Sequence, residues 1–158
     1  MINLKKLKKT DLNFCYDLIE LDRENYLDLI KIGWNKNGIE LQFYKDINYS
    51  FGIFENKVLI AFMLGDLISV EKDSEYEILV IYVKKSNRRK GLATKLLRHL
   101  EELKKHLNLK KIHLEVSKKN NDAIFFYKRN DFNLMSIRKN YYSEDDQRFD
   151  ALCYSKLL

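Results

Sequence analysis

The sequence predicts one mixed α/β domain spanning residues 1–158, and three observations support that prediction. The chain is long enough to bury one sizeable core and too short for two ordinary domains. Hydrophobic patterns typical of strands and of helices alternate through its middle, and paired strand patterns flank them. Proline is absent, and no glycine- or serine-rich linker divides the chain.

The first fifty residues are predicted to form one strand followed by helices. Residues 2–7 alternate weakly in hydrophobicity, and Thr10 can serve as the N-cap of a helix whose apolar residues recur at helical spacing. Residues 26–34 suggest a second, short helix. Gly33 and Gly38 interrupt the helical pattern, which residues 41–47 are expected to resume.

The central residues are predicted to supply the core of a sheet. Residues 51–54 and 58–64 have the pattern of two strands joined by a tight turn, in which Asn56 can adopt a positive φ. Residues 76–83 are apolar or aromatic on both alternating faces apart from one glutamate, so this strand is expected in the middle of the sheet. The leucines from 92 to 107 then follow one helical stripe, opposite basic residues.

The last fifty residues are predicted to add three strands and one helix. Residues 112, 114 and 116 are apolar and alternate with His113 and Glu115, which is the pattern of a half-buried strand. Residues 121–129 are predicted to form a short helix, and residues 136–142 and 151–157 to form the final strands.

Composition excludes several classes of protein. No apolar run approaches the roughly 18 residues that a membrane helix needs, and the first residues lack the apolar stretch of a secretory signal. The only cysteines, Cys15 and Cys153, stand at opposite ends with no ligand-like spacing, so we expect neither a disulfide scaffold nor a metal site. Two free thiols in a reducing compartment indicate a cytoplasmic protein without a membrane partner.

The positive charge is concentrated in one segment. The chain carries a formal charge of +6, but residues 84–111 alone hold eleven Lys or Arg against two Glu, which is +9, and the remainder sums to −3. Such a segment is typical of a solvated helix face or of contact with an anion, either nucleic acid or a phosphorylated cofactor.

The turn between residues 83 and 92 combines several features of an anion site. A central strand is predicted to end here, a basic loop to follow, and an amphipathic helix to begin near Gly91. The first turn of a helix carries unpaired amides and a partial positive charge, and small residues let a ligand approach the backbone. The glycine spacing is neither that of a P-loop nor that of a dinucleotide fingerprint. This turn could hold a pyrophosphate, although a plain basic loop fits the segment as well.

Three motifs in this order resemble one family. They are Arg88-x-x-Gly91-x-Ala93, then Leu114-Glu115-Val116-Ser117-x-x-Asn120-x-x-Ala123-Ile124-x-x-Tyr127, then Asn140-Tyr141-Tyr142 with Asp150-Ala151. The chain resembles the GNAT superfamily of N-acetyltransferases over roughly residues 58–157, and most of all its protein N-terminal acetyltransferases of the ribosomal-protein alanine type. The resemblance implies a mostly antiparallel mixed sheet of six to seven strands, flanked by helices and splayed between its central strands.

The resemblance also implies acetyl-CoA as cosubstrate and assigns residues to bind it. The end of the central strand would bind the pantetheine arm, the basic turn the pyrophosphate, and the residues before the later helix another part of the cofactor. These residues are Ile81, Tyr82, Val83, Arg88, Arg89, Lys90, Gly91, Leu92, Ala93, Thr94, Asn120 and Ala123.

For catalysis, the resemblance implies Glu115 as general base, acting through water, and Tyr127 as the acid near the sulfur of coenzyme A. Taken alone, a glutamate on a strand suits a solvated face and a helical tyrosine suits core packing. The substrate-facing residues would be Tyr26, Trp34, Tyr141 and Tyr142. No cysteine lies near either motif, so a covalent enzyme intermediate is not expected.

The predicted function is transfer of the acetyl group of acetyl-CoA to a primary amine, by direct attack in a ternary complex. The expected acceptor is the α-amine of a protein or peptide N-terminus; the alternative is a small amine such as a polyamine, an amino sugar or an amino-acid derivative. A nucleic-acid-binding module using residues 84–111 and a cofactor-binding protein without turnover are the other possibilities, and the first is disfavoured because no nucleic-acid motif accompanies the basic residues. The expected assembly is a monomer or a homodimer.

Overall fold

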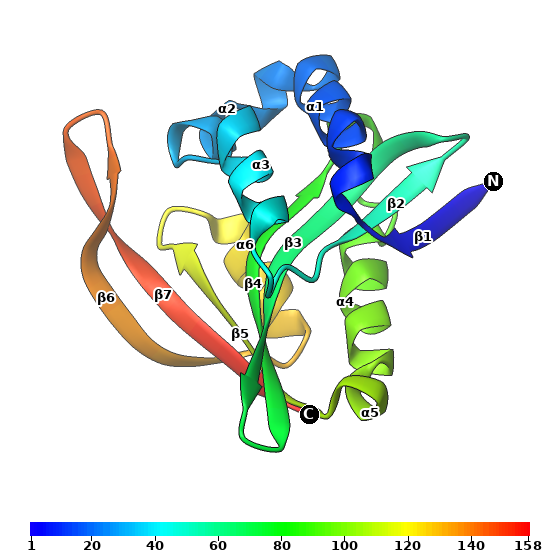
Figure 1. Ribbon diagram of the computed structural model, residues 1–158. Helices are drawn as coiled ribbons and strands as arrows, with labels where there is room; N and C mark the ends of the chain where they lie inside the picture. The colour runs from blue at the N-terminus through cyan, green and yellow to red at the C-terminus, as the bar shows by residue number, and fades with distance from the viewer.

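One seven-stranded sheet forms the centre of the computed structural model, which describes residues 1–158. Its strands are β1 (Ile2–Lys6), β2 (Phe51–Glu55), β3 (Val58–Val70), β4 (Asp73–Val83), β5 (Leu109–Ser117), β6 (Asn133–Glu144) and β7 (Gln147–Leu157). They lie side by side in the order β1-β2-β3-β4-β5-β7-β6, and only β4 and β5 run parallel (Figure 1). The predicted mixed and mostly antiparallel sheet is confirmed, with β4 in its middle.

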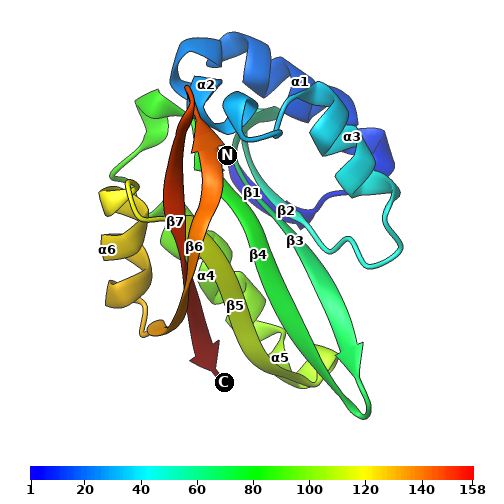
Figure 2. The same cartoon turned by 90° about the vertical axis from the view of Figure 1, so that its left-hand side faces the viewer.

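Helices cover both faces of this sheet. They are α1 (Leu12–Leu21), α2 (Arg23–Lys31), α3 (Lys36–Tyr44), α4 (Leu92–Glu102), α5 (Lys104–Leu107) and α6 (Asn121–Arg129), with 3-10 turns at Lys9–Asp11 and Lys85–Asn87. Figure 2 shows α1, α2 and α3 on one side of the sheet and α4 and α6 on the other. None of these helices is long and apolar enough to cross a membrane.

Two hydrophobic cores follow from this layering. On one face, Tyr26 of α2 and Phe43 of α3 pack with side chains of β3 and β4 such as Tyr82. On the other face, the leucine stripe of α4 and Tyr127 of α6 join one core with side chains of β2, β3, β4 and β5, among them Leu114. Successive side chains of a strand point to opposite faces, so the central strands need apolar residues at nearly every position.

The parallel strands β4 and β5 separate partway along their length. Their pairing runs from Ser74 opposite Leu109 to Ile78 opposite Leu114 and stops there. Beyond that pair, β4 continues to pair with β3 and β5 with β7. The β3–β4 register shifts at Gly65, so that Leu79 is an extra residue in β4, and such a bulge bends its strand. An opening between two central strands results.

Three local predictions were wrong. Thr10 lies in a 3-10 turn rather than at a helix N-cap, and Asp11 is the cap residue of α1. The leucine stripe is broken into α4 and α5 at Leu103. Gly38 lies inside the first turn of α3, where a Cβ would collide with the carbonyl oxygen of Gly33, so this glycine permits a close approach instead of ending a helix.

Candidate active site

The turn that joins β4 to α4 leaves its amide groups free. Residues 89–94 donate no backbone hydrogen bond to the rest of the chain, and no side chain caps α4. Arg89 and Gly91 both have a positive φ, 62° and 75°, and a Cβ at position 91 would meet nothing within 4 Å. Open space therefore lies in front of several unpaired amides at the positive end of a helix, and a pyrophosphate fits such a place.

The buried carboxylate of Asp22 holds this turn in place. Asp22, between α1 and α2, accepts hydrogen bonds from the hydroxyl of Tyr82 at 2.6 Å and from the amide of Lys85 at 2.9 Å. Burial alone would raise the pKa of Asp22, but these bonds and one from Asn25 outweigh it and hold the pKa below its ordinary value. Asp22, at the junction of α1 and α2, thus fixes the end of β4 and the start of the turn.

The side chain of Arg88 folds back on the end of β4. Its Nε donates to the carbonyl oxygen of Val83 at 3.0 Å, and its guanidinium lies 5.7 Å from the ring centre of Tyr82. Lys85, Arg89 and Lys90 are exposed around it. The turn therefore keeps its positive charge at the surface, where it can meet phosphate groups.

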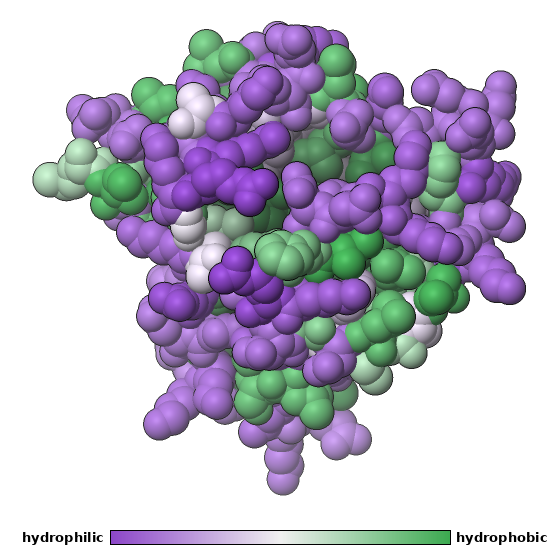
Figure 3. Space-filling model, turned by 180° about the vertical axis from the view of Figure 1, so that it is seen from behind, coloured by the Kyte–Doolittle hydropathy of each residue, from purple (hydrophilic) through white to green (hydrophobic).

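The end of β4 also has unpaired backbone groups on the side of the opening. The amide of Lys84 bonds to Ile60 of β3, and backbone groups alternate in direction along a strand, so those of Ile81 and Val83 point away from β3. No residue of β5 pairs with them. The carbonyl oxygen of Val83 accepts from Arg88, so the groups of Ile81 and the amide of Val83 are the ones without a partner on this side. An extended ligand can add to this edge by backbone hydrogen bonds, as the predicted pantetheine contact requires. Seen from the side of α4 and α6, apolar side chains show in a recess among hydrophilic ones (Figure 3).

A cleft of about 720 Å³ lies on the α2–α3 side of the opening. Its walls come from the turn between α2 and α3, from α3 itself and from β6, and its floor from β4 and β5. The lining residues are Lys31, Ile32, Gly33, Trp34, Gly38, Leu41, Gln42, Lys45, Glu77, Ile78, Leu79, Glu115, Tyr141, Tyr142 and Ser143. Four of the predicted catalytic or substrate-facing residues are among them.

Glu115 stands in the floor of this cleft. Its side chain is 24% exposed, and Oε1 accepts a hydrogen bond from Nη1 of Arg138 at 2.6 Å. The thiol of Cys153, opposite it on β7, lies 3.8 Å from the same oxygen. Glu115 shares a strand face with His113, whereas Leu114 and Val116 face the opposite core. This position can accept a proton from a group in the cleft.

Tyr127 lies on the other side of the sheet, in the core beneath α6. Burial raises the pKa of its hydroxyl, and the neighbouring Tyr142 raises it further. The pKa of Tyr142 is itself raised to about 12, first by burial and then by the charge of Glu115. Tyr142 is therefore close to both predicted catalytic residues, and Tyr127 stays protonated at neutral pH, as a proton donor must.

Asn120 and Ala123 contact each other at the start of α6. The side-chain oxygen of Asn120 accepts from the amide of Ala123 at 3.1 Å and so caps the helix. The amide of Ala123 is already used in this way, and the exposed Asn120 keeps its NH2 group for another partner.

The predicted substrate-facing residues divide into two groups. Trp34, Tyr141 and Tyr142 lie in the cleft wall. Tyr26 does not reach the cleft, because its side chain is fully buried and packs edge-on against Tyr82 at 4.7 Å. It turns inward because α2 presents this position to the sheet.

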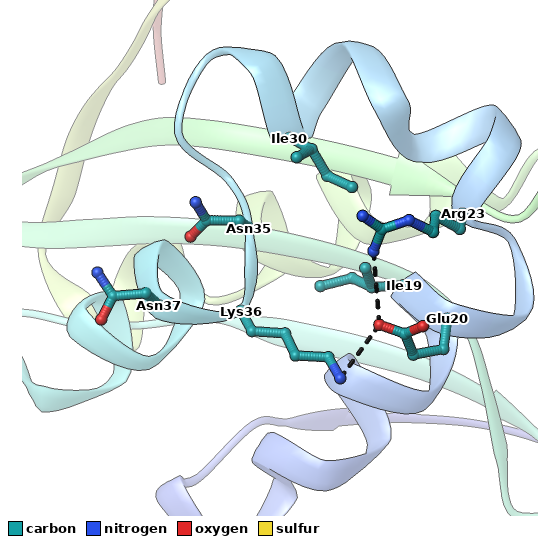
Figure 4. Close-up of a pocket in the computed structure, with 7 residues that line it drawn as sticks. All are labelled: Ile19, Glu20, Arg23, Ile30, Asn35, Lys36 and Asn37. Carbon is teal, nitrogen blue, oxygen red and sulfur yellow. Dashed lines mark ion pairs between the residues drawn. The ribbon is translucent and has the colours of Figure 1, made fainter.

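A second, smaller hollow of about 270 Å³ lies among α1, α2 and α3 (Figure 4). Glu20 lies at its centre and pairs with Arg23 at 3.6 Å and with Lys36 at 3.1 Å. None of the predicted site residues lines it. No group of three or more His, Cys, Asp or Glu side chains comes together as a metal site.

Several residues in the cleft or in contact with Glu115 were not predicted from the sequence. Arg138 and Cys153 reach Glu115 only through the pairing of β5 with β7 and of β7 with β6. The strand patterns of β5 and β7 were the one available signal. They would have placed Cys153 opposite Glu115 only if the register between the two strands had been known. Lys31 and Lys45 come from α2 and α3, whose packing no local pattern predicts.

The sheet that opens between two parallel central strands, with free amides in the turn after one of them, defines the class of GNAT-fold acyltransferases. Comparison with known proteins agrees: residues 14–132 match the model of the acetyltransferase (GNAT) family. The chain belongs to this family, and it is an acetyl-CoA-dependent N-acetyltransferase.

Individual relatives are consistent with this membership. The [ribosomal protein bS18]-alanine N-acetyltransferase of Escherichia coli (strain K12) is 34% identical over 104 residues, which cover 65% of this chain and 67% of that protein. The crystal structure of the ribosomal-protein-S18-alanine N-acetyltransferase from Escherichia coli has a TM-score of 0.79 at 27% identity, covering 99% of this chain and 94% of that one. Arabidopsis thaliana NAA60 in complex with a bisubstrate analogue has a TM-score of 0.80 at 18% identity, covering 99% and 98%, and shares the fold.

Proposed function

We propose that this protein acetylates the α-amino group at the N-terminus of a peptide or protein. The observation that carries the proposal is the cleft itself, whose floor holds Glu115 and whose walls hold Trp34 and the tyrosine pair Tyr141 and Tyr142. A cleft of about 720 Å³ is large enough for the first residues of a chain, not merely a small amine. The bS18-alanine N-acetyltransferase relative is named for an acceptor of this kind.

Bound acetyl-CoA would supply a thioester whose carbonyl carbon accepts the amine. Its pyrophosphate would lie on the amides of residues 89–94 beside Arg88, and its pantetheine arm along Ile81 and Val83, with Asn120 as a further contact. A free backbone amide at the strand end would meet the negative charge that develops on the carbonyl oxygen. The open space at Gly91 and the unpaired strand edge support these assignments.

In this proposal the chain moves two protons. Glu115 takes a proton, through water, from the acceptor ammonium, and the neutral amine then forms its bond to the acetyl carbon while the carbon–sulfur bond breaks. Tyr127 gives its proton to the departing sulfur, and the second proton of the nitrogen, lost as the amide forms, restores the Tyr127 hydroxyl through water. Glu115 lies in the cleft and Tyr127 lies under α6, on the opposite side of the sheet. The opening between β4 and β5 lies between the two residues.

A substrate panel tests the acceptor. Acetyl-CoA turnover would be compared for peptides with a free N-terminus, the same peptides with a blocked N-terminus and an internal lysine, and small amines such as spermidine and glucosamine. We expect kcat/KM to be highest for free N-termini. Higher values for a small amine would assign the enzyme to the alternative class of acceptors, and blocked peptides with equal activity would indicate lysine side chains.

A further inference from the structure

The base proposed for acetyl transfer is held by an arginine that no sequence motif singled out. Arg138 lies on β6, two strands away from Glu115, and its Nη1 is 2.6 Å from Oε1 of that residue. The thiol of Cys153 approaches the same oxygen. Both contacts are to Oε1, and Oε2 has no partner in the chain and is not a buried atom, so it remains open to the cleft.

The arginine is itself fixed in place. Its guanidinium carbon lies 3.9 Å from the ring centre of Tyr141, a separation typical of a cation–π contact. Residues three apart in a regular strand point to opposite faces, so this contact requires an irregular strand. The register of β6 against β7 shifts between Arg138 and Tyr142, Asn140 takes a φ of 54°, and its amide donates to Asp150 at 3.1 Å. The bulge brings the Tyr141 ring over the guanidinium.

We infer that Arg138 is a positioning residue for the acetyl transfer: it anchors Oε1 of Glu115, so that a charged carboxylate presents Oε2 to the acceptor amine. The inference rests on the proposed role of Glu115. Charge-assisted hydrogen bonds with an arginine are short and directional, and misplacing a catalytic group slows the reaction even when the group is present. Tyr141 would act indirectly, by holding the guanidinium.

Several charged and polar groups surround Glu115. Arg138 and Tyr142 face it from β6, Cys153 from β7, and Glu77 of β4 lines the same cleft floor, while His113 precedes it on its own face of β5. Arg138 is the one cation in direct contact with the carboxylate, and the ion pair raises the pKa of the guanidinium as well. Removing it leaves Oε1 without its charged hydrogen-bond donor, so the carboxylate is no longer held in one orientation.

The test compares Arg138→Gln with Arg138→Lys and with Lys139→Gln, an exposed neighbour on the same strand. We expect Arg138→Gln to lower kcat about tenfold while the affinity for acetyl-CoA stays within about twofold. Arg138→Lys should recover part of the loss in kcat, because it restores a cation that can donate to Oε1. Lys139→Gln should behave as wild type. A kcat for Arg138→Gln equal to that of Lys139→Gln overturns the inference.

A double variant separates positioning from a general structural effect. If Arg138 acts through Glu115, then Glu115→Gln combined with Arg138→Gln should be no slower than Glu115→Gln alone. Losses that multiply would overturn the inference and leave the proposed base intact. Full activity of Glu115→Gln would remove the base from the proposed function and this inference with it. Acetyl-CoA binding, measured on every variant, reports that each one is folded.

Discussion

The two halves of the active site are built in different ways. Most of the half proposed for the cosubstrate is one continuous segment, from Ile81 at the end of β4 to Thr94 in the first turn of α4, to which Asn120 at the start of α6 adds one contact. The half proposed for the acceptor joins five separate parts: the α2–α3 turn, α3, β4, β5 and β6. The first is defined by local backbone geometry, whereas the second exists only when the whole sheet and the helices over it are in place.

This difference explains why the sequence predicts the geometry of the cosubstrate half and does not predict that of the acceptor half. A strand end, a basic loop and a glycine at a helix start lie next to one another in the chain, and the chemistry of free amides follows from the helix itself. The acceptor cleft instead depends on which strands pair and in which register. It follows that substitutions in the two halves should separate acetyl-CoA affinity from acceptor turnover.

The largest effect on this separation is expected for Glu115→Gln. Loss of a general base typically lowers kcat about a hundredfold or more, while acetyl-CoA affinity should be unchanged because the residue lies on the acceptor side. Steady-state kinetics and a direct binding measurement check both. Glu77→Gln is the matched control, since Glu77 lines the same floor without an arginine partner. An equal loss in both variants would indicate a general field effect of the cleft, not a specific base.

Asp22→Asn tests whether the half proposed for the cosubstrate depends on a residue outside its own segment. Asp22 accepts from Tyr82, Lys85 and Asn25, and an amide can replace only part of this network, so we expect a loss of about 2 kcal/mol in the free energy of unfolding at pH 7.

The pH dependence of that loss has a definite sign. The folded pKa of Asp22 lies below its ordinary value of 3.8, so the carboxylate stabilises the fold above that value and ceases to do so as pH falls through the folded pKa. The difference in the free energy of unfolding between wild type and Asp22→Asn should therefore become smaller as pH falls below about 4. Urea unfolding at pH 7 and at acid pH measures it, and a gap that widens on acidification would contradict the mechanism.

Tyr127→Phe tests the residue on the far side of the sheet. The change removes a hydroxyl and no volume from the ring, so the core beneath α6 should be preserved. We expect kcat to fall about tenfold with little change in acetyl-CoA affinity, because the departing sulfur loses its proton donor. Tyr154→Phe, in the same hydrophobic core, is the control. Unchanged turnover would remove Tyr127 as the acid.

Two glycines allow a symmetrical comparison of the halves. Gly91 and Gly33 both have a positive φ, 75° and 101°, and a Cβ at either would meet nothing within 4 Å. Alanine at such a position costs about 1 kcal/mol in backbone strain. Gly91→Ala should weaken acetyl-CoA binding about fivefold through distortion of the turn. Gly33→Ala should leave the acetyl-CoA affinity unchanged and raise the KM for the acceptor. An equal loss of acetyl-CoA affinity in both variants would show that the two halves are coupled.

Sequence reasoning identified most helices and strands from local patterns, although it misplaced the start of α1, and it failed where distant segments meet. The helix over 121–129 was predicted at the observed bounds because a polar cap and an apolar spacing both lie within it. Tyr26 was expected to face the substrate, but it is buried because the side of a helix that meets the sheet depends on how that helix packs. Gly38 was taken for a helix breaker, since nothing in the sequence shows the Gly33 carbonyl that approaches it.

Arg138 shows the same limit inside the active site. Its distance from Glu115 along the chain is 23 residues, and the contact needs two strand registers and a bulge to form. A lysine-and-arginine-rich chain offers many candidates for such a partner, and charge alone cannot choose among them. The roles assigned to Glu115 and Tyr127 rested on resemblance, because an isolated glutamate or tyrosine carries no such signal.

The smallest effect is expected at the rim of the acceptor half. Lys31 of α2 pairs with Glu144 of β6 at 3.2 Å, which ties the helical wall of the cleft to the hairpin opposite. Both groups are in contact with solvent, so the pair is weak, and Lys31→Met should change the KM for a peptide by only about twofold at low salt. Since salt screens exposed charges, the difference from wild type should vanish at about 0.5 M salt. Lys36→Met is the matched control, because Lys36 pairs with Glu20 in the smaller hollow, away from the cleft. A salt-independent change in KM would mean that the Lys31 stem contacts the acceptor directly, and the rim would then belong to the binding surface.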